Sequence, residues 1–454
     1  MKYIVYSFFI AALIVGAIGG IAAIVRTETV VSPGALKETE NALPVPAKEQ
    51  TKTLEERIRN AEERSSRVKG LYMTAAVATD QGRAAGRLRD TIISLAETTE
   101  INGVVIDVKE VCGPEYNSLR LQTLLEELHK KNIWAIARIV TFKDVSHIKT
   151  HPGWYLTRTS AHTTEADPCK EKEYLRDKNS SGEEPNIIFW QDKKGGYWLD
   201  PADPDAREYI AGFAKKMIDL GFDELQFDYV RFPSDGDVEN AIYPAWDRKT
   251  RKEEVLKSFF GFINTSLKTY KPEIILSADL FGYVAATGGD STIGQNLADI
   301  GNSFDYVSFM VYPSHYYNGL TLPPEPEQKL EGVAFSFADA RTHPDVVVYR
   351  SLLYARDFLE GKITLGAKKS EKKKSVGTSS PQVAEKHITP VPLSRVKFRP
   401  WLEDFFHEQD RIAKRPYGAQ KVRMQIDGAE KSEDHGWLLW NASNVYTKEA
   451  LKLR

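Results

Sequence analysis

The sequence predicts an α/β fold, a (β/α)8 TIM-type barrel, and three observations support this. From Val68 onward, short apolar runs rich in β-branched residues alternate with stretches of helical periodicity, which is typical of βα units. Eight such runs occur, and a helical segment follows each of the first seven, as in a closed parallel barrel. At 454 residues with 42% hydrophobic residues, the chain can bury a barrel core and carry extensions. A doubly wound sheet is the alternative, but no glycine-rich phosphate-binding fingerprint supports it.

The predicted elements alternate along the chain. The strands are expected at 70–74, 103–108, 133–140, 224–230, 274–280, 306–312, 397–404 and 436–441. The helices are expected at 87–99, 119–131, 204–220, 248–270, 293–300, 344–359 and 419–431. The helix before the fourth strand has the clearest ends, since Asp203 is a suitable N-cap, Pro204 suits the first turn and Gly221 suits the stop.

The amino-terminal region predicts a membrane anchor. Residues 4–25 are uncharged, mostly apolar and flanked by basic residues. About 20 such residues span a bilayer, whereas the apolar core of a signal peptide has about 7–15. We therefore expect a single-pass signal-anchor over 1–26, a cleaved signal being the alternative, with the rest of the chain outside the cytoplasm at the cell membrane. Residues 27–66 are rich in proline and charge, which favours an extracytoplasmic linker with a short helix from Leu54.

Two insertions are expected in the barrel domain, predicted over 67–454. Residues 144–200 follow the third strand, on the face where barrels carry their chemistry. Their aromatic side chains either line a cleft or form the core of a small packed subdomain. Residues 361–395 are rich in lysine and serine and precede the seventh strand, which places them on the opposite face. A flexible solvated loop is expected there, and contact with an anionic wall polymer is the alternative.

Composition excludes several classes of function. A net charge of −2 without a basic domain argues against nucleic acid as a partner. No metal-binding HExxH or CxxC motif and no GxSxG nucleophile elbow occur, so neither a metal site nor a serine hydrolase is expected, and no cofactor is implied. Cys112 and Cys169 both fall in loops on the predicted catalytic face. Export permits a disulfide between them, and two unpaired thiols are the alternative.

The fourth predicted strand carries the most informative residue. Asp228 interrupts the apolar run 225–230, and a buried carboxylate is costly unless it is paired or used. Alternation places Gln226, Asp228 and Val230 on one face. Because barrels do their chemistry at the carboxyl ends of the strands, Asp228 is a candidate nucleophile or charge stabiliser.

A second carboxylate, Asp279, reaches the equivalent height on the fifth strand. Cleavage of a glycosidic bond needs one carboxylate opposite the developing positive charge and a second, protonated one at the leaving oxygen. Asp228 and Asp279 are the predicted catalytic pair, and a separation of roughly 5–6 Å would suit a retaining mechanism. The predicted substrate-binding residues are Asp107, Lys109, Arg231, Tyr312, Trp401, Glu403, Asp404, Trp440 and Asn441.

These candidates leave alternatives open. Lys109 or Arg231 would help keep one carboxylate ionised, while Asp107 would raise the pKa of the other. Asp107 and Lys109 can equally form a structural ion pair, and Arg231 can bridge the strand to a helix. Tyr312 and Trp440 can belong to the core. Adjacent Glu403 and Asp404 have opposite parity, so at most one of them faces the barrel axis.

Several motifs together resemble a known family. These are WLDP at 198–201, FDYVRFP at 227–233, SADLFG at 277–282, MVYP at 310–313, RPWL at 399–402 and GWLLWNA at 436–442. They resemble a bacterial family of predicted glycoside hydrolases whose TIM-barrel domain is distantly similar to α-amylase and α-galactosidase barrels, and the resemblance covers about 69–446. It implies that Asp228 is the nucleophile. Amylases have a Glu as the acid on strand five, where this chain has Asp279, so Asp107, Glu403 and Asp404 are alternative acids.

These observations predict a membrane-anchored, extracytoplasmic glycoside hydrolase. It would cleave glycosidic bonds of cell-surface or wall polysaccharide by paired-carboxylate acid/base catalysis. A catalytically inactive carbohydrate-binding barrel is the alternative, motivated by the absent strand-five Glu. A third hypothesis is a surface scaffold whose linker and basic loop engage protein partners.

Overall fold

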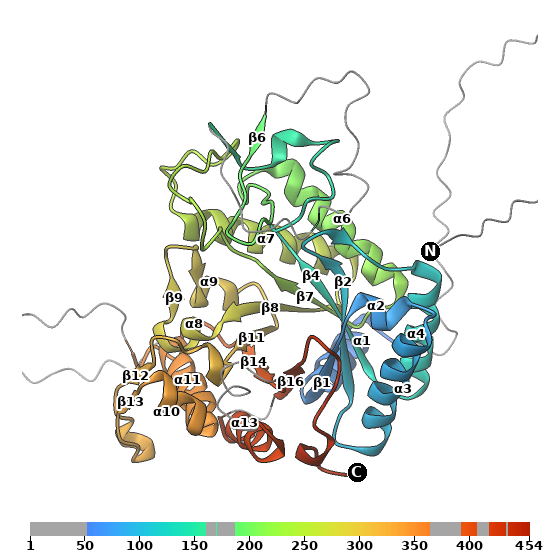
Figure 1. Cartoon of the computed structure of the whole chain (residues 1–454), viewed down its shortest axis with the longest axis vertical. Coiled ribbons are helices and arrows are strands. Elements are labelled where there is room, and N and C mark those ends of the chain that lie inside the picture. The colour runs from blue at the N-terminus through green and yellow to red at the C-terminus, as the bar shows by residue number, and fades with distance from the viewer. Residues whose placement is uncertain (1–51, 160–168, 170–186, 364–391, 406–416, 433–434) are drawn as a thin grey trace, which may run out of the picture. The chain divides into compact units, whose positions relative to one another are not determined.

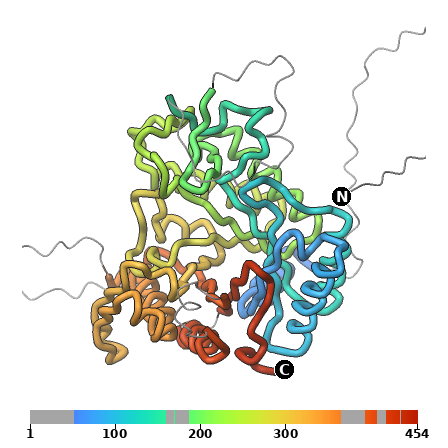
Figure 2. The backbone as a smooth tube through the Cα atoms, in the orientation of Figure 1, coloured from blue at the N-terminus to red at the C-terminus, as the bar shows by residue number. Residues whose placement is uncertain are grey.

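The computed structural model describes residues 52–159, 169, 187–363, 392–405, 417–432 and 435–454. Within them, eight parallel strands close into a barrel with helices around it, which confirms the predicted fold class (Figure 1). The barrel strands are β1 (Val68–Met73), β2 (Gly103–Glu110), β4 (Trp134–Val140), β7 (Glu224–Asp228), β8 (Ile275–Phe281), β11 (Tyr306–Met310), the pair β14 (Lys397–Phe398) and β15 (Trp401–Glu403), and β16 (Gly436–Trp440). The first and last strands pair side by side, blue beside red in Figure 2.

The helices on the outside of the barrel are α2 (Ala75–Thr79), α3 (Arg83–Thr98), α4 (Ser118–Lys130), α6 (Pro204–Leu220), α7 (Lys252–Tyr270), α8 (Gly282–Thr287), α9 (Leu297–Gly301), α10 (Phe337–Thr342), α11 (Pro344–Leu359) and α13 (Ala419–Ser432). The seven predicted helices occur in the predicted order as α3, α4, α6, α7, α9, α11 and α13, and shorter helices and minor strands that were not predicted lie before and between them. The minor strands are β3 (Gly113–Pro114), β5 (Thr157–Arg158), β6 (Ile188–Phe189), β9 (Gly289–Asp290), β10 (Gln295–Asn296), β12 (Leu320–Leu322) and β13 (Val333–Phe335). Helix α6 begins and ends as predicted, with Asp203 accepting from the Ala206 amide and Gly221 in the left-handed region at φ +107°.

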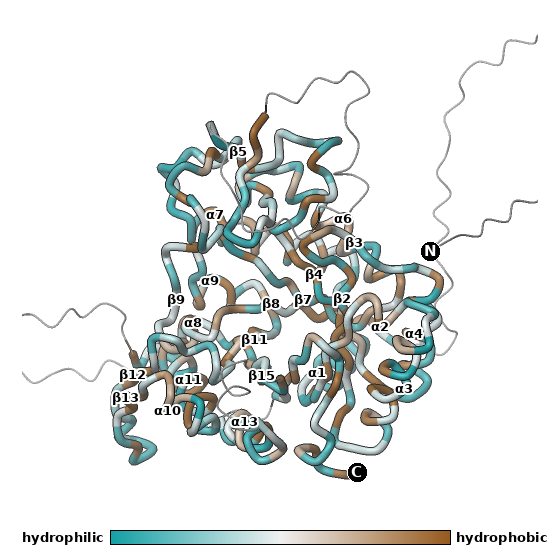
Figure 3. The backbone as a smooth tube through the Cα atoms, in the orientation of Figure 1, coloured by the Kyte–Doolittle hydropathy of each residue, from teal (hydrophilic) through white to brown (hydrophobic). Residues whose placement is uncertain are grey.

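Two layers of apolar side chains form the core of the barrel, and Figure 3 shows that the strands carry many of the hydrophobic residues. The larger layer lies between the strands and the helices. The smaller one lies inside the barrel and includes Val105, Ile136, Ile275 and Leu438. The two layers follow from the alternation of side chains along each strand. A third, smaller cluster includes Leu320 and Leu322 of β12 and Val333 of β13.

The fourth barrel strand is shorter than predicted. Strand β7 ends at Asp228, and the next residue, Tyr229, adopts a left-handed backbone with φ +50°. This breaks the alternation, and Val230 joins the outer apolar layer instead of the barrel interior. The prediction that Val230 shares a face with Gln226 and Asp228 is therefore wrong.

Helix α1 (Leu54–Ser65) packs against the amino-terminal end of the barrel. The Ser65 carbonyl accepts from Nη2 of Arg399 at 2.6 Å, and Nη1 of Arg399 lies 2.7 Å from Oε2 of Glu224. Both charged side chains are fully buried. The short helix predicted from Leu54 is thus present, but it belongs to the barrel body and not to a separate linker.

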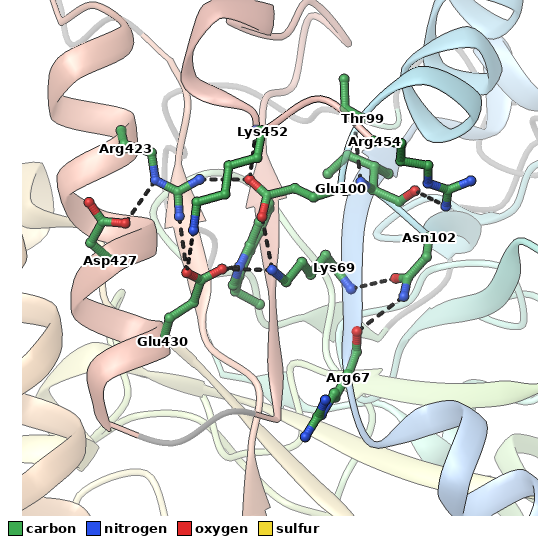
Figure 4. A network of polar contacts seen from close by, with 12 residues as sticks. Arg67, Lys69, Thr99, Glu100, Asn102, Arg423, Asp427, Glu430, Lys452 and Arg454 are labelled. Atoms are coloured by element: carbon green, nitrogen blue, oxygen red, sulfur yellow. Dashed lines mark hydrogen bonds and ion pairs between the residues drawn. The ribbon is translucent and has the colours of Figure 1, made fainter.

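A surface ion network joins the strands at which the barrel closes (Figure 4). Lys69 of β1 pairs with Glu100 at 2.8 Å and with Glu430 of α13 at 2.7 Å. Arg423 of α13 contacts the same two carboxylates, at 2.6 and 3.3 Å. Four alternating charges thereby connect the first βα unit to the last.

The predicted anchor at 4–25 lies outside the described residues, as do 160–168 and 170–186 of the first insertion and 364–391 of the second. Among the residues that the structure does describe, no helix is both long and apolar enough to cross a membrane. In the first insertion, Tyr155, Trp190 and Trp198 are almost fully buried and form part of the outer core.

Candidate active site

A cavity of about 200 Å³ opens at the carboxyl ends of the barrel strands. It is lined by Arg138, Asp228, Tyr229, Arg231, Asp279, Phe281, Met310, Tyr312, His315, Trp401 and Trp440. Both predicted catalytic carboxylates therefore line one cavity, together with four of the predicted substrate-binding residues.

Arg138 of β4 is the central cation of the cavity. Its Nη1 donates to Oδ1 of Asp107 at 2.6 Å, and its Nη2 donates to Oδ2 of Asp228 at 2.5 Å. The neighbouring carboxylates raise the pKa of Arg138 well above its usual range despite its burial. One guanidinium thus holds two acidic side chains from the strands on either side of it.

Asp279 of β8 lies in a different environment. Its side chain is 1% exposed, Trp401 donates from Nε1 to its Oδ1 at 2.8 Å, and Nε of Arg138 lies 3.8 Å from its Oδ2. Burial, followed by the negative charge of Asp228, raises the pKa of Asp279 well above its usual range. The two cavity carboxylates therefore lie in different electrostatic environments.

Asp107 lies behind the cavity lining and binds Arg138 from there. It is completely buried, and it accepts from Arg138 and from the Tyr72 hydroxyl. Glu110, at the end of the same strand, lies 3.4 Å from Arg138. Burial, with the adjacent Asp107, raises the pKa of Glu110 to about 8. Sequence reasoning missed Arg138, Glu110 and Tyr72, although Arg138 interrupts an apolar strand just as Asp228 does.

Lys109, a predicted substrate-binding residue, lies outside the cavity lining. The pairing register between β2 and β4 shifts between Asp107 and Lys109, so that Lys109 lies opposite Ile139, a residue of the outer core. This bulge turns Lys109 away from the barrel interior, where its Nζ pairs with the buried Asp144 at 2.9 Å. The predicted Asp107–Lys109 pairing is replaced by Asp107–Arg138 and Lys109–Asp144.

Glu403, Asp404 and Asn441 also lie outside the cavity lining. Glu403 accepts from the Ser314 hydroxyl at 2.6 Å. Asp404 caps the carboxyl-terminal segment by accepting from the amide and hydroxyl of Thr447, at 2.7 and 2.6 Å. Asn441 shapes the turn after β16 by donating to Val445 O at 2.6 Å. Their positions suit structural roles, because backbone groups that leave the strand ends need hydrogen-bond partners.

Aromatic side chains form the remaining wall. Trp401 and Trp440 meet edge to face with centroids 5.6 Å apart, and Arg138 lies 5.1 Å from the Trp440 centroid. Tyr312 is buried, and burial followed by the charges of Asp279 and Asp228 raises its pKa well above its usual range. These rings flank the carboxylates, as the sequence predicts.

Arg231 reaches the cavity because of the turn at Tyr229. It lies 5.0 Å from the Trp198 centroid, and Trp198 comes from the first insertion. The described part of that insertion therefore packs as a subdomain, and its Trp198 ring contacts the cavity residue Arg231. Cys112 and Cys169 are joined by a disulfide with a Cα–Cα distance of 5.4 Å, which ties the insertion to the end of β2. Among the described residues, no group of three or more His, Cys, Asp or Glu side chains could hold a metal ion.

The model of a family described as "putative glycosyl hydrolase domain" matches residues 70–446. The chain belongs to this family. The match covers all of the cavity lining and every strand of the barrel except the first two residues of β1. A search of curated proteins finds no match.

Solved structures with detectable similarity include a hypothetical protein from Ruminiclostridium thermocellum, 26% identical, with 46% of this chain and 96% of that chain covered and a TM-score of 0.34. The α-galactosidase from Thermus thermophilus is 12% identical, with 84% of this chain and 63% of that chain covered and a TM-score of 0.39. The α-amylase from H. orenii is 13% identical, with 53% and 51% covered and a TM-score of 0.35. This chain spans less than two thirds of either enzyme, and the family assignment rests on the family model.

Proposed function

We propose that this protein is a membrane-anchored, extracytoplasmic glycoside hydrolase acting on cell-surface or wall polysaccharide, with Asp228 as nucleophile and Asp279 as general acid. The observation that carries the proposal is the contrast between two carboxylates in one cavity. Asp228 is held by a guanidinium at 2.5 Å, while burial and the charge of Asp228 raise the pKa of Asp279. Pairs of acids whose environments separate their protonation states are typical of acid/base sites.

The proposed reaction proceeds by double displacement. Asp279 donates its proton to the glycosidic oxygen as the bond to the leaving sugar breaks, and a carboxylate oxygen of Asp228 bonds to the anomeric carbon. Asp279, now ionised, then removes a proton from water, whose oxygen displaces Asp228 and releases the second sugar. Arg138 holds the Asp228 carboxylate in position through its Nη2 donor. Trp440 and Tyr312 offer ring faces and edges to the sugar. A cavity of about 200 Å³ is smaller than the roughly 300–1,000 Å³ of typical ligand pockets, so it suits one sugar unit of a longer chain.

Two features support the proposed location. The apolar segment 4–25 is long enough for an anchor. The disulfide between Cys112 and Cys169 suits an oxidising compartment outside the cytoplasm.

A catalytically inactive carbohydrate-binding barrel is the second candidate function, and one observation favours it. Both carboxylate oxygens of Asp228 are already engaged, Oδ2 by Arg138 at 2.5 Å and Oδ1 by the Tyr229 amide at 2.6 Å. Incubation with a panel of glycans separates the two functions. A hydrolase releases new reducing ends, and Asp228→Asn abolishes this release, whereas a binding protein retains glycan and releases none.

A further inference from the structure

Arg231 is a buried cation on the wall of the proposed active site. Only 6% of the residue is exposed, yet it lines the cavity that contains Asp228 and Asp279. Among the residues that the structure describes, no carboxylate lies within ion-pair distance of its guanidinium. Burying an unpaired charge costs several kcal/mol. We therefore expect Arg231 to have a function that offsets this cost.

Three aromatic rings and one carbonyl hold the guanidinium in place. The ring centroids of Phe281, Trp198 and Tyr229 lie 4.7, 5.0 and 5.1 Å from it. Its Nη1 donates to the Phe232 carbonyl at 3.0 Å. Cation–π contacts compensate part of the burial cost, but they do not use N–H donors. A guanidinium has five of these, and one protein acceptor bonds to it among the described residues.

Arg138 provides the contrast within the same cavity. Its guanidinium donors are engaged by Asp107 and Asp228 at hydrogen-bond distance. The guanidinium of Arg231, in contrast, bonds to one backbone carbonyl and to no carboxylate among the described residues. A carboxylate that enters the cavity would therefore meet N–H donors on Arg231 that no protein carboxylate occupies.

We propose that Arg231 binds the carboxylate of an acidic sugar, so that the substrate is a polysaccharide containing uronic acid units. This inference rests on the proposed glycoside hydrolase function and specifies its substrate class. A planar carboxylate accepts two parallel hydrogen bonds from a guanidinium. A neutral sugar hydroxyl brings no charge that could form an ion pair with this guanidinium. Because Arg231 lines the same cavity as Asp228 and Asp279, the acidic unit is the one beside the bond that is cleaved.

Binding of monosaccharides tests this without requiring turnover. Isothermal titration of the wild-type protein with glucuronate and galacturonate is compared with titration by glucose and galactose. We expect a preference of about tenfold or more for the acids, since hydrogen bonds to charged groups contribute about 1.5–3 kcal/mol, and this preference should weaken as salt is added. Equal affinity for acidic and neutral sugars in the wild-type protein overturns the proposal, as does tighter binding of a sulfated sugar than of the uronates.

Variants then assign the preference to one side chain. Arg231→Gln should abolish it, and Arg231→Lys, which keeps the charge but loses the planar fork, should reduce it. Arg207→Gln is the matched control. Arg207 also packs on an aromatic ring, with its guanidinium 6.0 Å from the Phe259 centroid, and donates to a backbone carbonyl, but it lies outside the cavity lining. An unchanged uronate preference in folded Arg231→Gln overturns the proposal. If that variant does not fold, the wild-type comparison decides.

The two proposals fail in different ways. If the protein binds uronates but releases no reducing ends from uronate-containing polymers, the hydrolase proposal is refuted and the uronate-binding proposal is retained. If it hydrolyses a neutral polymer and shows no preference for the carboxyl-bearing counterpart, the uronate-binding proposal is refuted and the hydrolase proposal is retained.

Discussion

Arg138 and Asp228, on neighbouring strands, are joined by a hydrogen-bonded ion pair in which Nη2 lies 2.5 Å from Oδ2. Nη1 of the same guanidinium lies 2.6 Å from Oδ1 of Asp107, and its Nε lies 3.8 Å from Oδ2 of Asp279. One side chain from the middle of an apolar strand therefore contacts three carboxylates, Asp107, Asp228 and Asp279.

Replacing Arg138 by Met should destabilise the protein and abolish turnover. It leaves Asp107 and Asp228 buried without their cation, and breaking a buried ion pair in this way costs about 3–5 kcal/mol. Urea unfolding followed by circular dichroism measures the loss. Arg138→Lys should recover part of the stability. An Arg138→Met variant with the wild-type midpoint would show that the pair contributes nothing.

Asp279 should set the alkaline limit of activity. Because its pKa is raised, the proton needed by the leaving group persists above the ordinary carboxyl range and is lost as pH rises through the raised pKa. Asp279→Asn should lower kcat by about 10²–10⁴-fold and remove this limb from the pH profile. Aryl glycosides with acidic phenols as leaving groups need no proton, so they should restore most of the rate. Equal losses on both substrate types would contradict the assignment.

Glu110 should make stability fall with rising pH. Its pKa rises from an ordinary value of 4.5 to about 8 on folding, so the folded state binds more protons than the unfolded state between these values. The contribution is complete below about pH 4.5 and is lost as pH rises through about 8. Glu110→Gln should flatten the decline of Tm between pH 5 and pH 9, with a residual slope from Asp279. A wild-type Tm that increases over this interval would refute the sign.

The buried pair at the other end of the barrel should affect stability alone. Arg399→Met removes the partner of fully buried Glu224, to whose two oxygens Nη1 donates at 2.8 and 2.7 Å. We expect a loss of about 3–5 kcal/mol in the free energy of unfolding. The double variant with Glu224→Met should regain much of it. Below the unfolding temperature, kcat should match that of the wild type, so a selective loss of kcat would contradict the separation of the two ends.

Strand alternation explains what could be predicted. Asp228 and Asp279 stand at matching heights on neighbouring strands, so placing the strands was enough to bring both to one cavity. Trp401 and Trp440 followed by the same parity. Arg138 could have been found by that argument as well, because it is a charge at an inward position between Ile136 and Val140.

The remaining errors arise where alternation breaks. The bulge between Asp107 and Lys109 reverses the direction of Lys109, and the left-handed Tyr229 removes Val230 from the barrel face while it brings Arg231 to the cavity. Neither the bulge nor the left-handed turn can be predicted from the residue types of the strand in which it occurs. Asp404 and Asn441 bind segments that follow the strands, and such partners depend on how distant segments meet.

The most direct measurement is the release of reducing ends from a panel of neutral and uronate-containing glycans by the wild-type protein and by Asp228→Asn. Both proteins should show the same far-ultraviolet circular dichroism spectrum. We predict release by the wild type and a decrease of more than about 10⁴-fold in the variant, as expected when a nucleophile is removed. Equal release by the two proteins would contradict the central role of Asp228, and glycan binding without release by the wild type would show a binding barrel in place of an enzyme.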